Sequence, residues 1–162
     1  MSTLNNIRLL VLASWLGAAI FFSAAVAPSA FRVLRAFNLP NASEIAGAIV
    51  SRTLSVVNTS GFVLSVLLLI TAFVLKESYG RSAFVLQTVL LVLLGVTTGV
   101  GEWVIAAKMR GLRVAMRTTI DQIPAGDPSR IAFDALHGYS VTALAIAIIA
   151  GLIAFFVVAN RR

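Results

Sequence analysis

Four apolar segments of about twenty residues, nearly free of charged side chains, constrain this chain more than any other feature. They cover about 9–27, 53–75, 83–105 and 138–159. Each is long enough to cross a hydrocarbon layer of ~30 Å as an α-helix. The composition agrees, because 59% of the residues are hydrophobic and only 12% are charged. We therefore expect an all-α integral membrane protein with one transmembrane domain over residues 1–162.

The segments between the spans predict how the helices are connected. A short polar turn at 76–82 predicts that the second and third helices are antiparallel neighbours. Asn41 and Glu44 have the spacing of a capping box at the start of the second helix, and Asp127 is the expected cap of the fourth. The third helix is expected to continue through Arg117. The prediction is an up-down four-helix bundle whose helices extend beyond one face of the bilayer.

Small residues at a spacing of four indicate close helix packing, which matters because lipid supplies no hydrophobic drive for helix association. The residues concerned in the third and fourth helices are Gly95, Gly99, Ala147 and Gly151. Two interpretations fit this pattern. It can form a dimerisation face, or it can serve packing within the bundle, which is common in membrane proteins and is favoured here.

Polar residues concentrate where four helix ends share one face of an antiparallel bundle. The predicted cluster consists of Arg32, Asn58, Glu102, Arg113, His137 and Ser140. Besides the terminal charges, the opposite half offers only Ser14, Thr71 and Gln87. Because ionisable side chains near a membrane usually face a partner, we expect Glu102 and His137 to face one another or Arg32. The cluster is interpreted as a ligand, ion or proton site, as a network that pins the helices together, or as groups that sit in interfacial water.

A metal site is a further alternative for part of this cluster. Met109 and Met116 are spaced seven apart in the third helix, and with His137 they offer soft ligands for Cu(I). Arg113 would repel a cation, and one histidine with two thioethers provides few ligands for a metal ion. Haem ligation by His137 and a methionine requires Met109 or Met116 to lie at the same height along the bundle as His137. We expect no cofactor, with copper or haem as the alternatives.

Several classes of function are excluded or disfavoured by the residues present. The chain has no cysteine, so it forms no disulfide or thiolate metal site and has no cysteine nucleophile. No phosphate-binding glycine loop, HExxH motif or serine triad is recognisable, and we expect a protein that is not an enzyme. The net charge of +7 comes from Lys and Arg at the ends of apolar spans, where they meet lipid head groups. Membrane lipid is the expected partner, rather than nucleic acid.

The distribution of positive charges predicts an orientation. The polar-cluster face carries eight Lys and Arg, whereas the other face carries five and the terminal amine. By the positive-inside rule the polar-cluster face lies in the cytoplasm. We expect the membrane to be a bacterial inner (cell) membrane.

Short motifs along the chain resemble a known family. They are Trp15-x-Gly17, Pro28-x-x-Phe31-Arg32-x-Leu34, Glu102-Trp103 leading to Leu112-Arg113, and Phe133-x-x-Leu136-His137-x-x-Ser140. Together they resemble the transmembrane protein 205-like membrane domains, which are distantly similar to copper-resistance D-type membrane proteins. The resemblance implies a four-helix membrane domain of unestablished activity, and it draws attention to Pro28 besides the cluster residues. Members often carry an Asn shortly after the Ser, where this chain has Thr142-Ala143-Leu144.

Three functions follow from these observations. The first is a non-enzymatic membrane protein whose polar cluster binds a small ligand or ion, with a role in transport or resistance. The second is an accessory or structural subunit that packs in a homo-oligomer or in a larger membrane complex. The third is a redox membrane protein that holds copper or haem.

Overall fold

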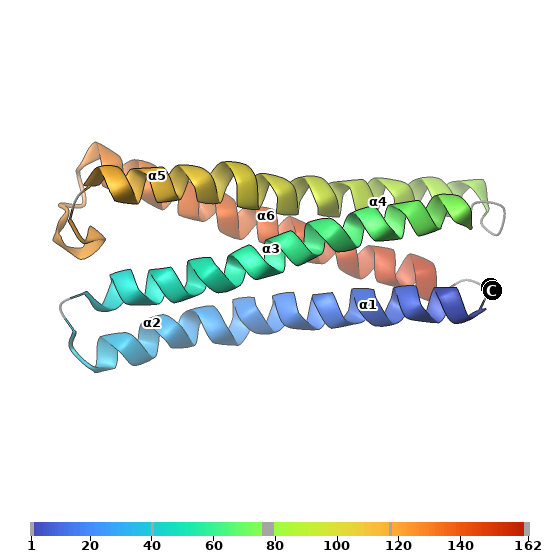
Figure 1. The fold of residues 1–162 in the computed structure, drawn as a ribbon, viewed down its shortest axis with the longest axis horizontal. Coiled ribbons are helices and arrows are strands. Elements are labelled where there is room, and N and C mark those ends of the chain that lie inside the picture. Colours follow the sequence, from blue (N-terminus) through green and yellow to red (C-terminus); the bar gives the residue numbers. More distant parts are fainter. Residues whose placement is uncertain (1, 40, 76–79, 117, 161–162) are drawn as a thin grey trace.

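The chain folds into four long helical rods that run alternately up and down, as the ribbon in Figure 1 shows. The computed structural model describes residues 2–39, 41–75, 80–116 and 118–160. The rods extend over Thr3–Ala36, Ala42–Val74, Arg81–Met116 and Pro128–Ala159. All four are long and apolar enough to span a membrane, and no strand occurs in the described residues. The expected fold class is confirmed.

Two of the rods contain a π-helical segment and two do not. The first rod comprises α1 (Ser2–Phe21), the π-helix η1 (Phe22–Val26) and α2 (Ala27–Ala36). The third comprises α4 (Arg81–Gly99), the π-helix η3 (Val100–Ala106) and α5 (Ala107–Met116). The others are the uninterrupted helices α3 (Ala42–Val74) and α6 (Pro128–Ala159). A 3₁₀ turn, η4 (Ile120–Gln122), lies in the connection before α6.

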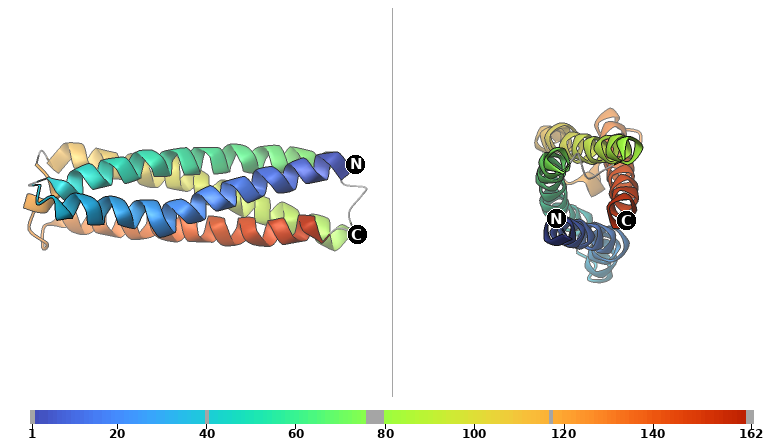
Figure 2. Two further views of the ribbon diagram at one scale, coloured as in Figure 1. Left: turned by 90° about the horizontal axis from the view of Figure 1, so that it is seen from below. Right: turned by 90° about the vertical axis from the view of Figure 1, so that its right-hand side faces the viewer.

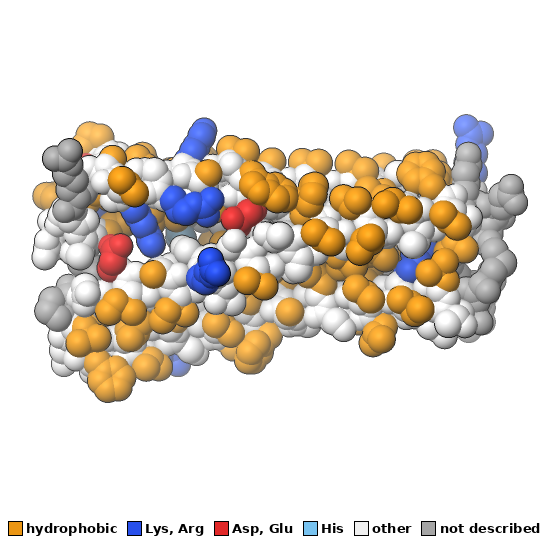
Figure 3. Space-filling view, in the orientation of Figure 1, with side chains coloured by type: hydrophobic (Ala, Val, Ile, Leu, Met, Phe, Trp, Pro, Cys, Tyr) orange, Lys and Arg blue, Asp and Glu red, His pale blue; other side chains and the backbone are white. Residues whose placement is uncertain are grey.

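The rods are longer than a bilayer requires. The shortest has 32 residues, which as an α-helix is about 48 Å long. A hydrocarbon core of about 30 Å leaves several turns of each rod outside it. Most charged side chains visible in Figure 3 lie over the half of the molecule that contains α2 and α5, and hydrophobic side chains cover most of the other half. The surplus length therefore lies mainly at the α2 and α5 end.

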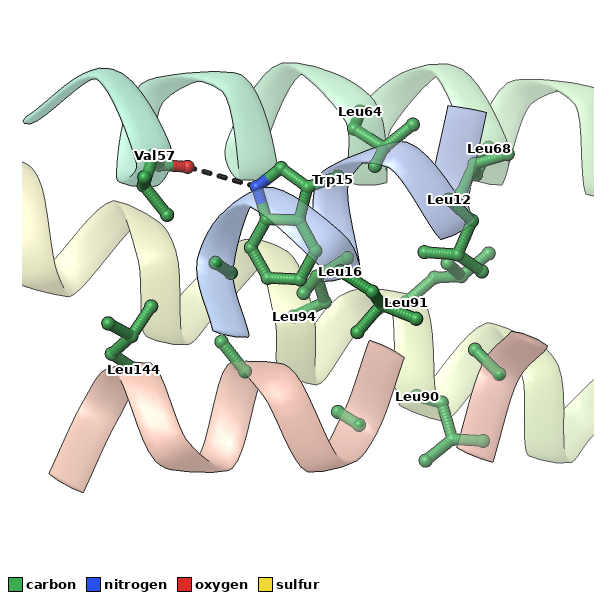
Figure 4. Packing of buried hydrophobic residues seen from close by; sticks show 14 of the residues in the cluster. Leu12, Trp15, Leu16, Val57, Leu64, Leu68, Leu90, Leu91, Leu94 and Leu144 are labelled. Carbon is green, nitrogen blue, oxygen red and sulfur yellow. Dashed lines mark hydrogen bonds between the residues drawn. The ribbon is translucent and has the colours of Figure 1, made fainter. Parts of the chain in front are cut away.

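The half of the bundle near both termini, which we call the closed half, is tightly packed. Here α1 and α4 each contact both α3 and α6, so the four rods form a ring that is visible end-on in Figure 2. Leu12, Trp15, Leu91 and Ala147 belong to its buried core. The indole Nε1 of Trp15 donates a hydrogen bond to the Val57 carbonyl at 3.0 Å (Figure 4). The core thus combines close packing with a satisfied polar group.

Small residues lie at the helix contacts of the closed half. A Cβ added to Gly61 would lie 2.8 Å from the Trp15 ring, and one added to Gly95 would lie 2.5 Å from Ser65 Oγ. Gly151 meets Leu16 in the same way, at 3.2 Å, and Ala147 is fully buried. A Cβ added to Gly99 would lie 3.4 Å from the Phe62 ring of α3. Gly95, Gly99, Ala147 and Gly151 are thus in contact with other helices of the same chain.

The predicted helix caps are right in one case and wrong in another. Asp127 caps α6, where its carboxylate accepts a hydrogen bond from the Ser129 backbone N–H at 2.8 Å. Asn41 precedes α3, but its side chain makes no capping bond. Glu44 is used differently from a capping-box partner, because its Oε2 accepts the Ile120 N–H at 3.4 Å and joins α3 to η4. Of the predicted turn at 76–82, residues 76–79 lie outside the described residues, as does Arg117.

The other half, which we call the open half, is arranged as two helix pairs. Helix α2 packs on α3, and α5 packs on α6. The two pairs diverge toward the end of the molecule opposite the termini, as Figure 1 shows on its left side. Side chains from both pairs line a shared internal space, and the candidate site lies there.

Candidate functional site

An inner cavity of about 280 Å³ lies where the two helix pairs begin to diverge. All four rods contribute to its walls, with Phe22 from η1, Leu54 and Ser55 from α3, Glu102 from η3 and Leu144 from α6. Most of its lining is aliphatic or aromatic. The polar side chains that line it are Ser23, Ser51, Ser55, Glu102, Arg110, Arg113, His137 and Ser140. An apolar cavity with a few convergent polar groups is typical of small-molecule sites.

Glu102 is the central polar group of the inner cavity. Its side chain is buried, with 8% of the residue exposed. One carboxylate oxygen, Oε1, accepts a hydrogen bond from Ser55 Oγ at 2.9 Å and lies 3.6 Å from Nη1 of Arg110. The other oxygen, Oε2, is buried and has no hydrogen-bond partner among the described residues. A buried acceptor without a donor is costly, so Oε2 is available to a donor from a ligand.

Both π-helices adjoin this cavity. Phe22 and Ser23 of η1 line it from one side, and Glu102 and Ala106 of η3 line it from another. A π-helical turn places an extra residue in the helix and is frequent at functional sites. The π-helix η1 is followed by Pro28, which lies in the first turn of α2. In η3 no proline is present, and the sequence offered no signal for this segment.

An outer cavity of about 420 Å³ adjoins the inner one and lies nearer the end of the open half. The two share five lining residues, which are Val50, Ser51, Met109, Arg113 and His137. Its outer wall adds two further arginines and one carboxylate, namely Arg35, Arg130 and Asp134. The outer cavity is therefore more strongly charged than the inner one and has an excess of positive groups.

The structure brings together most, but not all, of the predicted cluster. Glu102, Arg113, His137 and Ser140 all line the inner cavity. Arg32 is exposed and lines neither cavity, so the contact expected between it and Glu102 is not formed. Its place beside Glu102 is taken by Arg110, because η3 and α5 bring that side chain to the carboxylate.

Asn58 is buried but lies outside both cavities. It is 3% exposed, and its amide faces Gly101, where an added Cβ would be 3.0 Å from Nδ2. Ser55, one turn earlier in α3, contacts Glu102 instead. Sequence reasoning missed Ser55 and Arg110. The only signal for Ser55 is its position one helical turn from Asn58.

The predicted metal ligands are not brought together as a set. Met109 and His137 line both cavities, whereas Met116 lines neither. Among the residues that the structure describes, no group of three or more His, Cys, Asp or Glu side chains is placed to hold a metal ion. Of the three ligands considered for a Cu(I) site, Met116 is therefore separated from Met109 and His137.

The closed half contains buried polar side chains that the sequence did not place inside the bundle. Arg8 is 2% exposed, and its Nη2 donates to the Leu68 carbonyl at 3.5 Å. Gln87 is fully buried, and its amide atoms make no hydrogen bond within the described part of the chain. The expectation that the Lys and Arg side chains at the ends of the apolar spans meet lipid head groups is wrong for Arg8. Since α1 already begins at Ser2, Arg8 lies well inside the helix and points among its neighbours.

Two exposed aromatic residues indicate the depth of the site in the membrane. Trp103 adjoins Glu102 and is 54% exposed, and Tyr139 adjoins Ser140 and is 64% exposed. Trp and Tyr are enriched at the boundary between hydrocarbon and head groups. The neighbours of both residues line the inner cavity, so their exposure is consistent with a position of this cavity near that boundary.

A family profile described as a domain of unknown function, DUF4149, matches residues 10–118, which is more than half of the chain. The chain belongs to this family. No curated protein and no solved structure matches it. The match gives no evidence for similarity to transmembrane protein 205-like or copper-resistance proteins.

The matched region of this DUF4149 protein contains Glu102, Arg113 and both π-helices. His137 and Ser140 follow it on α6. Chemically, the DUF4149 chain thus presents a buried carboxylate acceptor in an apolar cavity, next to a positively charged outer cavity.

Proposed function

We propose that this DUF4149 protein is a non-enzymatic membrane protein that binds a small amphipathic molecule in its inner cavity. The observation that carries the proposal is the buried Oε2 of Glu102, which has no hydrogen-bond partner among the described residues. A ligand hydroxyl or ammonium group satisfies this oxygen. The bond is charge-assisted and forms in a mostly apolar surrounding, where such bonds are strong.

The walls of the inner cavity support an apolar ligand body. Phe22, Leu54, Leu144 and Ile148 surround the space with carbon atoms. At about 280 Å³ the cavity is at the small end of the range for ligand pockets, which suits a single alkyl chain or a small ring system. A ligand with one polar end and one apolar body fits both features.

The position of the inner cavity supports entry from the lipid. Val141 and Ala145 of α6 line it although both residues are exposed on the surface of the bundle. Ser23 and Ala27 line it from the first rod. The space therefore reaches the surface between the first and fourth rods, which faces lipid in a membrane. Membrane lipid is the proposed source of the ligand, and a bacterial inner membrane with the open half on the cytoplasmic face is the proposed location.

Binding, rather than transport by one chain, is the role that the architecture favours. In the described part of the chain, the four rods of the closed half pack around a buried hydrophobic core, which is unlike the lining of a transport path. A part in resistance is expected only from the resemblance of the sequence motifs, to which the family match adds no evidence, and it stays a prediction. Association with a second copy or with a larger complex also stays a prediction.

The absence of native cysteine permits a direct test. Ser140→Cys places a single thiol in the inner cavity, and N-ethylmaleimide labelling of the full chain in zwitterionic nanodiscs reports its accessibility. Octylamine, which has an ammonium group and a short alkyl chain, is the probe. We expect octylamine to slow the labelling of Ser140→Cys. Adding Glu102→Gln should weaken this protection by about 10- to 100-fold in octylamine concentration, since a charge-assisted hydrogen bond is lost.

Ala125→Cys is the matched control, because Ala125 is exposed and lines neither cavity. Its labelling rate should not respond to octylamine. Protection of Ser140→Cys that is equally strong with and without the Glu102→Gln substitution would refute the proposal, as would the absence of any protection.

A further inference from the structure

We propose that the outer cavity binds a phosphate group, centred on the guanidinium of Arg113. This inference deepens the proposed function and rests on it, because one ligand would place its phosphate in the outer cavity and its apolar chain in the inner one. The two cavities adjoin, because five residues line both of them, and Arg113 is one of the five. The chemical class inferred is therefore a phosphate monoester that carries an alkyl or acyl chain.

Arg113 is held in place by contacts that leave its charge without a counterion. A Cβ added to Gly47 would lie 2.5 Å from Nη2 of Arg113, so the guanidinium occupies space that only a glycine leaves open. On another side it lies over the Phe133 ring, 5.2 Å from the centroid, a cation–π contact. In the described part of the chain no carboxylate lies within 4.0 Å of it. A fixed guanidinium without a carboxylate partner, facing a cavity, is suited to bind an anion.

Among the described residues, the outer cavity has more positive than negative side chains on its wall, and its one carboxylate is already next to an arginine. Arg130 donates from Nη1 to the carbonyls of Ile120 at 3.1 Å and Ile123 at 2.6 Å, which fixes its position. Its Nε lies 4.0 Å from Oδ2 of Asp134, so this carboxylate already has a positive neighbour. Arg35 lines the cavity from α2 and contacts the Phe31 ring. Arg35 and Arg113 thus remain to attract an anion.

Phosphate fits this arrangement better than a carboxylate does. The arginines approach the outer cavity from α2, α5 and α6, which are three different directions. A phosphate presents oxygens in three directions and up to two negative charges, and the planar arginine fork pairs well with it. The position near the head-group boundary, marked by Trp103 and Tyr139, is where lipid phosphates occur.

The test uses the full chain in zwitterionic nanodiscs with Ser43→Cys as the reporter, since Ser43 lines the outer cavity alone. Protection from N-ethylmaleimide is measured with three probes: inorganic phosphate, octanoyl lysophosphatidate and neutral mono-octanoylglycerol. We expect lysophosphatidate to protect and mono-octanoylglycerol not to do so. Arg113→Gln should weaken protection by about 10- to 100-fold, and Arg113→Lys should lie between this variant and the unchanged chain.

Arg32→Gln is the matched control, because it removes one positive charge from the same end of the molecule outside both cavities. It should change protection by no more than about two-fold. Protection by lysophosphatidate alone supports a lipid source of the phosphate. Protection by inorganic phosphate as well supports a site that also accepts the free anion.

Two results would overturn the inference. One is protection that is as strong in Arg113→Gln as in the unchanged chain, and the other is the absence of protection by either phosphate probe. The octylamine experiment at Ser140→Cys is read separately. If octylamine protects there while both phosphate probes fail at Ser43→Cys, the phosphate site is wrong and the inner-cavity binding stands. If octylamine also fails, both are wrong.

Discussion

The closed half and the open half are built from the same four rods, yet they use glycine for different purposes. In the closed half, Gly61 and Gly95 let neighbouring helices approach, and the atoms that fill the space are Trp15 and Ser65 of those helices. In the open half, Gly47 is approached by the guanidinium of Arg113. The absence of a side chain permits helix packing in one half and the placement of a charge in the other.

This difference shows how one bundle can be rigid at one end and hollow at the other. Trp15, buried and hydrogen-bonded to Val57, holds neighbouring helices together in the closed half. Beyond it η1 and η3 interrupt the first and third rods, and the helix pairs diverge around Glu102. Stability should therefore depend mainly on the closed half and ligand binding on the open half. Five substitutions test this division.

Trp15→Ala should have the largest effect on stability. It removes a buried aromatic side chain and the hydrogen bond to Val57, and we expect a loss of about 3 kcal/mol in the free energy of unfolding. Reversible unfolding in mixed micelles, followed by circular dichroism, measures it. His137→Ala in the open half is the comparison and should change stability by less than about 0.5 kcal/mol, since His137 is exposed. Comparable losses would contradict the division.

Gly61→Ala should be the next most harmful change. The new Cβ would meet the Trp15 ring at 2.8 Å and the Thr98 methyl group at 2.9 Å, so overpacking should cost about 2 kcal/mol. Gly17→Ala is the matched control on the outer face of α1, where nothing lies within 4 Å of the added atom. It should be neutral or stabilise by up to about 1 kcal/mol. Thermal midpoints that fall equally in both variants would show that the contact is unimportant.

Ser55→Ala tests whether the polar contact in the open half contributes to stability. It removes the 2.9 Å hydrogen bond to Glu102, and we expect a loss of about 1 kcal/mol. Ser60→Ala in the same helix is the control, because Ser60 bonds to the Val57 carbonyl of its own helix. Chemical denaturation of the two variants measures the difference. A neutral Ser55→Ala would mean that Ser55 does not support Glu102.

Gly47→Ala should separate stability from binding. The added methyl group displaces only the guanidinium of Arg113 and meets no backbone atom, so stability should change by less than about 0.5 kcal/mol. Protection of Ser43→Cys by lysophosphatidate should nevertheless weaken several-fold, since the guanidinium moves. Unfolding and labelling are measured on the same preparation. Unchanged protection would show that the position of Arg113 does not matter for binding.

Asp127 predicts a small pH dependence at the outer end of the open half. The hydrogen bonds from the Ser129 hydroxyl and backbone N–H hold the pKa of the Asp127 carboxyl below its ordinary value of 3.8. A lowered folded-state pKa gives stability that is present above that ordinary value and is lost as the pH falls through the folded-state pKa. Asp127→Asn keeps a capping acceptor but should lose this dependence. Thermal midpoints of both proteins between about pH 5 and pH 2.5 compare them.

The sequence placed several of the cluster residues at the same end of the bundle because alternating helices bring alternate helix ends together. That argument needs only the span boundaries, and it brought Glu102, Arg113, His137 and Ser140 to one cavity. It failed for Arg32 because rotation about the helix axis, which the span boundaries do not determine, turns that side chain outward. It missed Arg110 for the same reason. The π-helix η3 adds a residue to the helix before Arg110, and no pattern in the sequence predicted this π-helix.

By itself, the sequence determined the number of spans, their alternation and the end of the bundle that carries most of the charge, because hydropathy and chain length set these properties. Tertiary structure alone decided that Arg8 lies inside, that Gly47 receives a guanidinium, and that Oε2 of Glu102 is left without a donor among the described residues. The physical reason is that these features depend on helix rotation and on contacts at distances of a few ångströms. Such contacts join residues far apart in the chain, so they cannot be predicted from a local sequence pattern.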